Sequence, residues 1–474
     1  MQRKYGLFTA ICMIVGTVIG SGVFFKAQTI LQKTEGNFLL GILAWIIGGA
    51  IMIACLLAFA SMAQKYEKVN GLIDYAEATV GSKYAYYVGW FSATIYLPAM
   101  TGVLAWLSAR YTLTFITSCW PNFPMMIPAA EGGCLFSPEC LALTLIFMVM
   151  SYVINTLSPK LAGKFQTTTT IIKFIPLTLM AVVGIIAGIF SPTHMLVSNF
   201  SAGADLGTRT GGILLAAVCA TSFAYEGWII TMSINAELKD SKRNLPKALL
   251  IGGVVVILTY LLYYVGVGGG APVQDLMDQG ANVAFVNVFG GVIGNILNLF
   301  VAISCMGTLN GLMLGTTRGL YALSVRNAGP DPELFSHVDE KSNMPTNSSV
   351  VGLLVVAFWC VYFYVANLFP TMGGLTVFEG TRFESVAFAF DSSELPIVTI
   401  YALYIPIFIM WMKKEKDENV MKRFVLPVLA IIASAFMCYA CIVGHKWAVA
   451  WYLVVFALVM LLGAAFYRKN KKTN

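Results

Sequence analysis

Apolar residues along the chain gather into long runs that short polar segments separate. Each run holds about 20 residues, the length that a helix needs to cross roughly 30 Å of hydrocarbon. The pattern therefore predicts an all-α integral membrane protein with about 12 transmembrane helices. The predicted spans are residues 6–31, 38–63, 85–113, 141–157, 165–190, 211–236, 248–269, 285–325, 348–368, 394–412, 424–443 and 447–467.

Composition narrows the class of protein further. Hydrophobic residues make up 58% of the 474 residues and charged residues only 11%, whereas a soluble domain carries about 25% charged residues. So few charges exclude a soluble enzyme, a secreted disulfide scaffold, a disordered protein and a nucleic-acid binder. We therefore expect the partners to be the lipid bilayer and a small-molecule substrate, with no nucleic acid. The sequence leaves the oligomeric state open.

The positive residues predict the orientation of the spans. If the spans alternate in direction, 23 of the 30 Lys and Arg residues fall on the side of the two termini, six fall on the other side, and Lys173 lies within a span. Cytoplasmic loops of membrane proteins carry the excess of Lys and Arg. This bias predicts a multi-pass protein of the plasma membrane with both termini in the cytoplasm, and it favours an even number of spans.

The first predicted span contains a glycine-rich segment, GTVIGSG, at residues 16–22. Each glycine lowers helix stability by about 1 kcal/mol relative to alanine. A break in a membrane helix is tolerated only where the freed backbone groups line a cavity or find other partners. Close packing of a continuous helix through small residues is the alternative. The segment alone leaves both interpretations open.

The sixth predicted span favours the break. It contains the sequence FAYEG at residues 223–227, with a carboxylate and a glycine in mid-membrane. A carboxylate within a membrane is a candidate for function because its desolvation is costly. Interrupted spans at matching places in two halves of a chain indicate an inverted-repeat transporter, and spans 1 and 6 match if spans 1–5 repeat as spans 6–10. Helix N-termini at the breaks would attract an anion and helix C-termini a cation, so a zwitterion fits both.

Lys173 is the other charge predicted to lie in mid-membrane. If it points inward, its ammonium could donate hydrogen bonds to the carbonyls that the first break frees, and would then replace a bound sodium ion. The alternative is a side chain that snorkels to the membrane surface from a tilted helix. The position alone does not decide between them.

Catalytic and metal-binding patterns are absent from the sequence. The three histidines, at 194, 337 and 445, lie in predicted loops, and Cys438 and Cys441 form a C-x-x-C on an apolar helix without a second pair. We therefore expect no catalytic residues, no metal and no cofactor, and we predict that the protein is not an enzyme. Three cysteines of the predicted external loop, at positions 119, 134 and 140, would allow one disulfide.

Four segments together resemble the amino acid–polyamine–organocation superfamily. Within it, the L-type amino acid transporter group and its bacterial serine/threonine and alanine/serine/cysteine exchangers are most similar. The resemblance implies a 5+5 inverted repeat with discontinuous helices 1 and 6, plus two C-terminal helices. In this chain the core would be residues 1–412, with repeats at about 6–190 and 211–412, and residues 413–474 would hold the two additional helices and a cytoplasmic tail. The segments are GTVIGSGVF at 16–24, FAYEGW at 223–228, ELKDSKRNLPKAL at 237–249 and GTLNGLMLGTTRGLYALSVRNAGP at 307–330.

The resemblance also implies roles for particular residues. The first break would hold the substrate carboxylate and the second its amino group, with the Phe223 ring as a gate on the extracellular side. Lys173 matches the lysine of the fifth span in the group, which implies independence of sodium. Glu226 departs from the family, where glycine or aspartate is frequent. The implied substrate-binding residues are Gly16, Thr17, Ile19, Gly20, Ser21, Gly22, Phe223, Ala224, Tyr225, Glu226 and Gly227.

These expectations combine into one function with two alternatives. The favoured function is a secondary transporter, a sodium-independent exchanger of small neutral amino acids that works by alternating access. A carrier for cationic amino acids or amines would use Glu226 as a counter-charge. A proton-coupled permease would titrate Glu226 during the cycle. The sequence does not decide which amino acid is carried.

Overall fold

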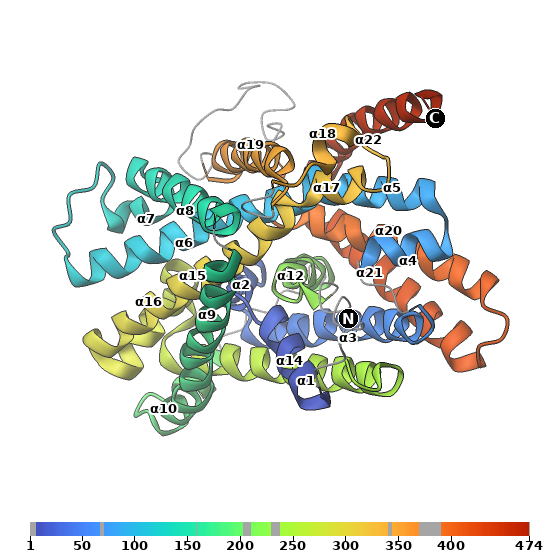
Figure 1. Ribbon diagram of the computed structural model, residues 1–474. Coiled ribbons are helices and arrows are strands. Elements are labelled where there is room, and N and C mark those ends of the chain that lie inside the picture. The colour runs from blue at the N-terminus through green and yellow to red at the C-terminus, as the bar shows by residue number, and fades with distance from the viewer. Residues whose placement is uncertain are drawn as a thin grey trace. The chain divides into compact units, whose positions relative to one another are not determined.

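The computed structural model describes residues 6–66, 71–157, 159–201, 210–228, 238–339, 344–368 and 390–473. Helices account for the regular structure of these ranges, and no β-strand is present among them (Figure 1). The prediction of an all-α protein is confirmed.

Most predicted spans appear as helices long and apolar enough to cross a membrane. Exposed leucine, isoleucine and valine side chains are frequent along them, as a lipid-facing surface requires and as a soluble protein avoids. The described residues therefore form a multi-pass membrane protein. Ten segments qualify: Phe38–Lys65, Ser82–Cys119, Pro138–Leu157, Leu161–Phe190, Lys242–Gly270, Ala281–Ser324, Thr346–Asn367, Leu395–Lys414, Met421–His445 and Ala448–Tyr467.

The two remaining predicted spans are the two with predicted breaks. The first is a bent pair of helices, α1 (Leu7–Val18) and α2 (Gly22–Lys33), whose axes differ by 49°. The sixth is a shorter apolar helix, α12 (Thr210–Ala224), and residues 229–236 of that predicted span lie outside the described ranges. The described part thus has ten or 11 spans where about 12 are predicted. The difference arises because an interrupted helix is too short to qualify alone.

The described helices fall into two units. Unit 1 comprises residues 1–88, 176–294 and 397–444, and unit 2 comprises residues 89–175, 295–396 and 445–474. Each unit contains helices from both predicted repeats. The division into units therefore does not test where the predicted repeats begin and end. The boundaries stay a prediction.

Unit 1 contains both breaks. The long helix α14 packs along α3 and α1, and α12 packs against α2 and α3. The helices of this unit, some of which continue into unit 2 as α16 does from residue 295 on, are α1, α2, α3 (Phe38–Lys65), α4 (Leu72–Thr79), α5 (Ser82–Phe91), η3 (Met180–Gly184), α10 (Ile185–Phe190), α11 (Met195–Ser201), α12, α14 (Ser241–Gly270), α15 (Val273–Gln279), α16 (Ala281–Thr317), α20 (Leu395–Lys414), η8 (Met421–Val425) and α21 (Leu426–His445).

A polar cluster ties the C-terminal end of α3 to distant segments of unit 1. Lys65 and Tyr66 both contact the carboxylate of Glu415, just after α20. Gln64 accepts a hydrogen bond from the Lys422 ammonium at 2.6 Å and donates one to the carbonyl of Lys242 at 2.8 Å. Burial by itself favours the neutral form of the Glu415 carboxyl, but the hydrogen bonds from Lys65 and Tyr66 outweigh burial and lower its pKa. We call these residues the α3 end cluster.

Unit 2 is built around α6, which packs against α8 and α19. A buried amide network joins α8, α16 and α9, because Asn155 donates to the Asn310 side-chain oxygen at 2.9 Å and Asn310 donates to the carbonyl of Ala162 at 3.3 Å. Cys119, Cys134 and Cys140 are free thiols, so the disulfide that their position would allow is not formed. The remaining helices are η1 (Ser92–Tyr96), α6 (Leu97–Cys119), η2 (Ala129–Glu131), α7 (Gly133–Phe136), α8 (Pro138–Leu157), α9 (Pro159–Leu179), α17 (Gly319–Ser324), α18 (Pro332–Ser336), α19 (Thr346–Phe363), η6 (Tyr364–Leu368) and α22 (Ala448–Thr473).

Candidate functional site

The first helix break lies between α1 and α2 in the glycine-rich segment. Helix α1 ends at Val18, Ile19 has an extended backbone with φ −68° and ψ 102°, and α2 begins at Gly22. The last carbonyls of α1 and the first N–H groups of α2 have no partner within their own helices. Ile19 and Ser21 are 0% and 1% exposed. The predicted break is confirmed, and a continuous helix through residues 16–22 is wrong.

The second break follows α12. Tyr225 still donates its N–H to the Thr221 carbonyl at 3.1 Å, and Glu226 and Gly227 then form a turn. Gly227 has φ +102°, a backbone conformation that side chains with a Cβ rarely adopt. Glycine is therefore required where the chain leaves the helix. The Glu226 side chain is half-buried in this turn.

The two breaks meet within unit 1. A Cβ atom built on Gly22 would lie only 2.7 Å from the Ala224 Cα and 3.2 Å from the Phe223 carbonyl oxygen. A Cβ on Gly227 would lie 3.2 Å from the Thr17 carbonyl oxygen. Two segments about 200 residues apart in the chain thus lie in direct main-chain contact, which glycine permits because it has no Cβ. Residues 16–22 and 223–227, predicted from the sequence as one site, lie together.

Individual side chains at the breaks differ in what they can contribute. The Thr17 side chain is exposed, and its hydroxyl donates to the carbonyl of Met13, one turn back in the same helix, at 2.7 Å. The Tyr225 hydroxyl donates to the carbonyl of Trp45 at 2.9 Å and the residue is fully buried. Both hydroxyls are therefore occupied by structural contacts. A ligand at the breaks would meet mainly backbone groups.

Tyr260 of α14 is a site residue that sequence analysis missed. Its hydroxyl lies 3.0 Å from the Val18 carbonyl oxygen and 2.9 Å from the Ala224 carbonyl oxygen, at the ends of α1 and α12. The side chain is 0% exposed, and its ring contacts the rings of Trp45 and Tyr225. The single hydroxyl hydrogen is thus shared between two carbonyls, one at each break, that have no partner within their own helices. No local pattern distinguishes this tyrosine from its neighbours in the same apolar run.

The predicted gate residue, Phe223, lies in the last turn of α12. It is 7% exposed, and its ring meets the ring of Phe25 edge to face, with centroids 5.9 Å apart. The ammonium of Lys26 lies 5.2 Å from the Phe223 centroid. The ring therefore contacts two residues of α2, the second helix of the broken first span. Its role as a gate stays a prediction.

Lys173, the predicted replacement for sodium, lies on α9 in unit 2 and is 4% exposed. Snorkelling requires an ammonium that reaches the surface, so this burial argues against snorkelling. The breaks belong to unit 1, and the predicted contact of Lys173 with them stays a prediction.

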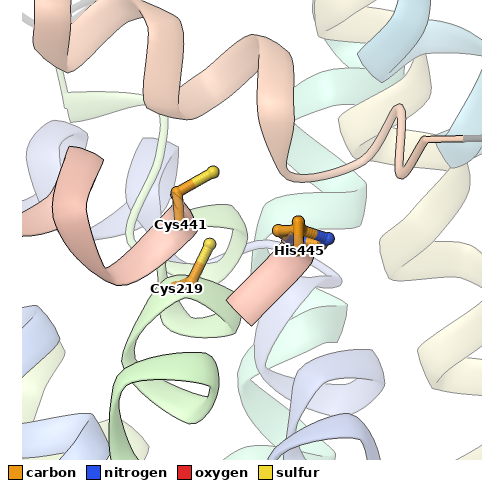
Figure 2. Close-up of side chains that lie close together, drawn as sticks. All are labelled: Cys219, Cys441 and His445. Atoms are coloured by element: carbon orange, nitrogen blue, oxygen red, sulfur yellow. The ribbon is translucent and has the colours of Figure 1, made fainter. Parts of the chain in front are cut away.

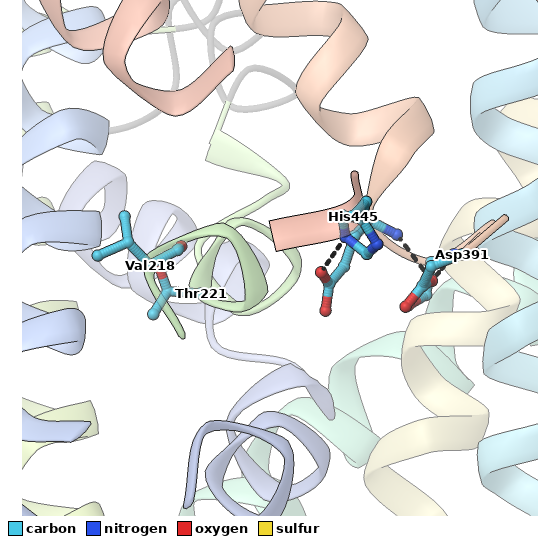
Figure 3. A network of polar contacts seen from close by, with 6 residues as sticks. Val218, Thr221, Asp391 and His445 are labelled. Atoms are coloured by element: carbon cyan, nitrogen blue, oxygen red, sulfur yellow. Dashed lines mark hydrogen bonds and ion pairs between the residues drawn. The ribbon is translucent and has the colours of Figure 1, made fainter. Parts of the chain in front are cut away.

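Side chains that can bind metals come together at two places. Cys219 of α12 and Cys441 of α21 are buried free thiols whose sulfur atoms lie within 4.8 Å (Figure 2). In unit 2, the Glu394 carboxylate contacts the His445 imidazole at 2.8 Å, and Asp391 caps the start of α20 by accepting the N–H of Ser393 at 2.7 Å (Figure 3). Glu394 is thus a hydrogen-bond partner of His445, and Asp391 is a helix cap. The expectation of no metal and no cofactor stays a prediction.

Membrane spans, a bent first helix and a second break packed against it define a membrane transporter with discontinuous helices. The crystal structure of MhsT in complex with L-phenylalanine shares this fold, with a TM-score of 0.61 and 13% identity, over 94% of this chain and 100% of that chain. At this identity the likeness concerns the fold alone. The predicted fold class is confirmed.

Sequence comparison gives the family. The sequence pattern described as amino acid permease matches residues 5–466, and the chain belongs to that family of transporters. The serine/threonine exchanger SteT of Bacillus subtilis (strain 168) is 26% identical over 450 residues, 92% of this chain and 90% of the relative. The b(0,+)-type amino acid transporter 1 of Mus musculus is 26% identical over 475 residues, which cover 98% of this chain and 88% of the relative. The Asc-type amino acid transporter 1 of Mus musculus is 27% identical over 383 residues, which cover 80% of this chain and 69% of the relative.

The family membership confirms two sequence predictions. The resemblance to the amino acid–polyamine–organocation superfamily and its L-type group is correct, because the relatives include a bacterial exchanger and Asc-type and b(0,+)-type transporters. The prediction that the protein is not an enzyme is also correct, since these relatives are transporters.

Proposed function

We propose that the protein is a sodium-independent exchanger of small neutral amino acids that works by alternating access. The observation that carries this proposal is the contact between the two helix breaks, where Gly22 approaches Ala224 backbone to backbone. Free N–H groups at the start of α2 suit a carboxylate, and carbonyls at the end of α12 suit an ammonium. A site built from backbone ends recognises the part that all amino acids share. The serine/threonine exchanger among the relatives supports a small neutral substrate.

The proposed site divides the substrate between the two breaks. The N–H groups at Ser21 and Gly22 would bind its carboxylate, and the carbonyls of Phe223 and Tyr225 its amino group. Ala224 already accepts the hydroxyl of Tyr260, so its carbonyl has one lone pair left for substrate. The Phe223 ring would close the site from the outside.

Independence of sodium rests on Lys173. A buried ammonium supplies three donors, and in this proposal they take the place of a cation that would otherwise bind the freed carbonyls of the first break. The low exposure of Lys173 supports an inward orientation.

The proposal predicts exchange without sodium. Purified protein in liposomes loaded with unlabelled serine should take up labelled alanine or serine from a sodium-free medium, because no sodium site has to be filled before the cycle proceeds. Liposomes without internal substrate are the control and should take up little. A steep dependence on sodium would contradict the role of Lys173, and equal uptake by empty liposomes would contradict exchange.

Glu226 decides between the favoured function and its two alternatives in the same assay. A paired or protonated Glu226 only shapes the pocket, so Glu226→Gln should leave neutral exchange largely intact and unlabelled lysine should compete weakly. Strong competition by lysine that disappears in Glu226→Gln would favour a carrier of cationic amino acids. Uptake driven by a pH gradient in wild type and lost in Glu226→Gln would favour proton coupling.

We also propose that both termini lie in the cytoplasm of the plasma membrane, because 23 of the 30 Lys and Arg residues then fall on the inner side. Reporter domains fused after Asn474 and inserted in residues 114–140 should report opposite sides of the membrane. Both reporters on one side would contradict the orientation and the even number of spans.

A further inference from the structure

Lys26 is a buried cation on the outer half of the broken first helix. Its side chain is 1% exposed, although lysine is almost never fully buried unless its charge is compensated. The ammonium lies 4.8 Å from the centroid of the Phe25 ring and 5.2 Å from that of Phe223. A cation within about 6 Å of an aromatic face is attracted by the ring. The two rings therefore supply part of the compensation.

These three residues join α2 to the end of α12. Phe25 and Phe223 meet edge to face, with an angle of 79° between their planes, and Lys26 contacts both rings. Lys26 follows Gly22 by about one helical turn, so the group lies next to the close approach of the breaks. We call Phe25, Lys26 and Phe223 the outer clamp.

Helix α2 is itself held in place. The Gln28 amide donates to the carbonyl of Met277 at 2.9 Å, and the Gln32 amide donates to the same carbonyl at 2.7 Å. These bonds attach α2 to α15 near Lys26. The Lys26 ammonium therefore lies on a helix that hydrogen bonds hold in place. Phe223 is the one residue of the outer clamp that lies on a different helix, α12.

We propose that Lys26 is a positioning residue for the Phe223 gate and that it selects against substrates with a positively charged side chain. This inference rests on the proposed function. The ammonium stabilises the Phe223 ring in its closed position, because opening the gate gives up the contact with Phe223 and keeps only the one with Phe25, on the same helix. The same positive charge, beside the site, repels substrates with a cationic side chain. Lys26 thus favours neutral amino acids from the outer side, independently of Glu226.

Three variants separate charge from packing. Lys26→Met removes the charge at similar length, Lys26→Arg keeps charge and ring contact, and Lys33→Met removes a charge from the same helix outside the clamp. In liposomes, Lys26→Met should lower the concentration of external lysine that halves serine uptake by about tenfold, a change equal to 1.4 kcal/mol. Lys26→Arg and Lys33→Met should stay near wild type. An unchanged lysine sensitivity in Lys26→Met, or an equal change in Lys33→Met, would overturn the proposal.

A second measurement needs no transport. The thermal stability of purified Lys26→Met, Phe223→Leu and the double variant should be non-additive, because each single variant already removes the contact between them. Additive losses would contradict the clamp. If Lys26→Met does not reach the membrane, Lys26→Gln enters both measurements in its place. Wild type that exchanges no amino acid would end the proposed function, whereas the stability measurement would still test the clamp.

Discussion

Gly22→Val should reduce transport by about 10- to 100-fold or more while the protein still reaches the membrane. The Cβ of any larger residue would lie 2.7 Å from the Ala224 Cα. No side-chain rotation relieves this contact, because the backbone fixes the position of a Cβ and the Ala224 Cα is itself a backbone atom. Overpacking of this kind costs about 1–3 kcal/mol, and each 1.4 kcal/mol changes an equilibrium about tenfold. The cost falls on the contact that brings the two breaks together. Labelled serine uptake and substrate binding by the purified variant measure the loss.

Gly211→Val is the matched control for this prediction. Gly211 lies on α12, the helix that carries the second break, and a Cβ there meets nothing within 4 Å. The control should transport like wild type. If Gly22→Val kept its transport rate and its apparent affinity, the contact between the breaks would be packing without a role in substrate binding.

Tyr260→Phe should slow transport by about tenfold with little loss of protein. The substitution keeps the ring between Trp45 and Tyr225 but removes the hydroxyl that reaches the Val18 and Ala224 carbonyls. A buried carbonyl left without a donor costs about 1–3 kcal/mol. We expect this cost to appear in the conformation with both breaks closed around substrate. Initial uptake rates at saturating serine measure it.

Tyr264→Phe provides the comparison one turn further along α14. Tyr264 is equally buried and stacks on Phe38, but its hydroxyl makes no hydrogen bond within the described residues. Its variant should keep the wild-type rate. Equal transport rates in the two variants would mean that the hydrogen bonds of the Tyr260 hydroxyl do not contribute to transport.

The parts of the site that follow from local sequence could be predicted. Three glycines in residues 16–22 and a glycine beside Glu226 weaken a helix wherever they stand, so both breaks were recognisable. Their contact was predictable only through the matching positions of the two spans. Hydropathy also placed the spans, because it measures length and polarity along one segment.

Tyr260 and Lys26 could not be predicted in the same way. Tyr260 lies in an apolar run with Tyr263 and Tyr264, and only the packing of α14 along α1, beside the end of α12, selects the one hydroxyl that meets the freed carbonyls. Lys26 is one of the six positive residues that the alternating spans place on the side opposite the termini. Its partner ring is about 200 residues away in the chain, and the matching positions of the two spans pair the breaks without indicating which side chains beside them meet.

The α3 end cluster bears on whether the C-terminal spans could be removed. Deletion after residue 412 would take away Glu415 and Lys422 and leave Lys65, Tyr66 and Gln64 without these bonds. Helix α21 also meets α3 deeper in unit 1, where the Cys55 sulfur lies 3.4 Å from the Ser434 hydroxyl. The predicted end of the second repeat at residue 412 therefore does not coincide with a break in the contacts of unit 1. A chain truncated there would lose the contacts that join the end of α3 to the segment after α20 and to α21.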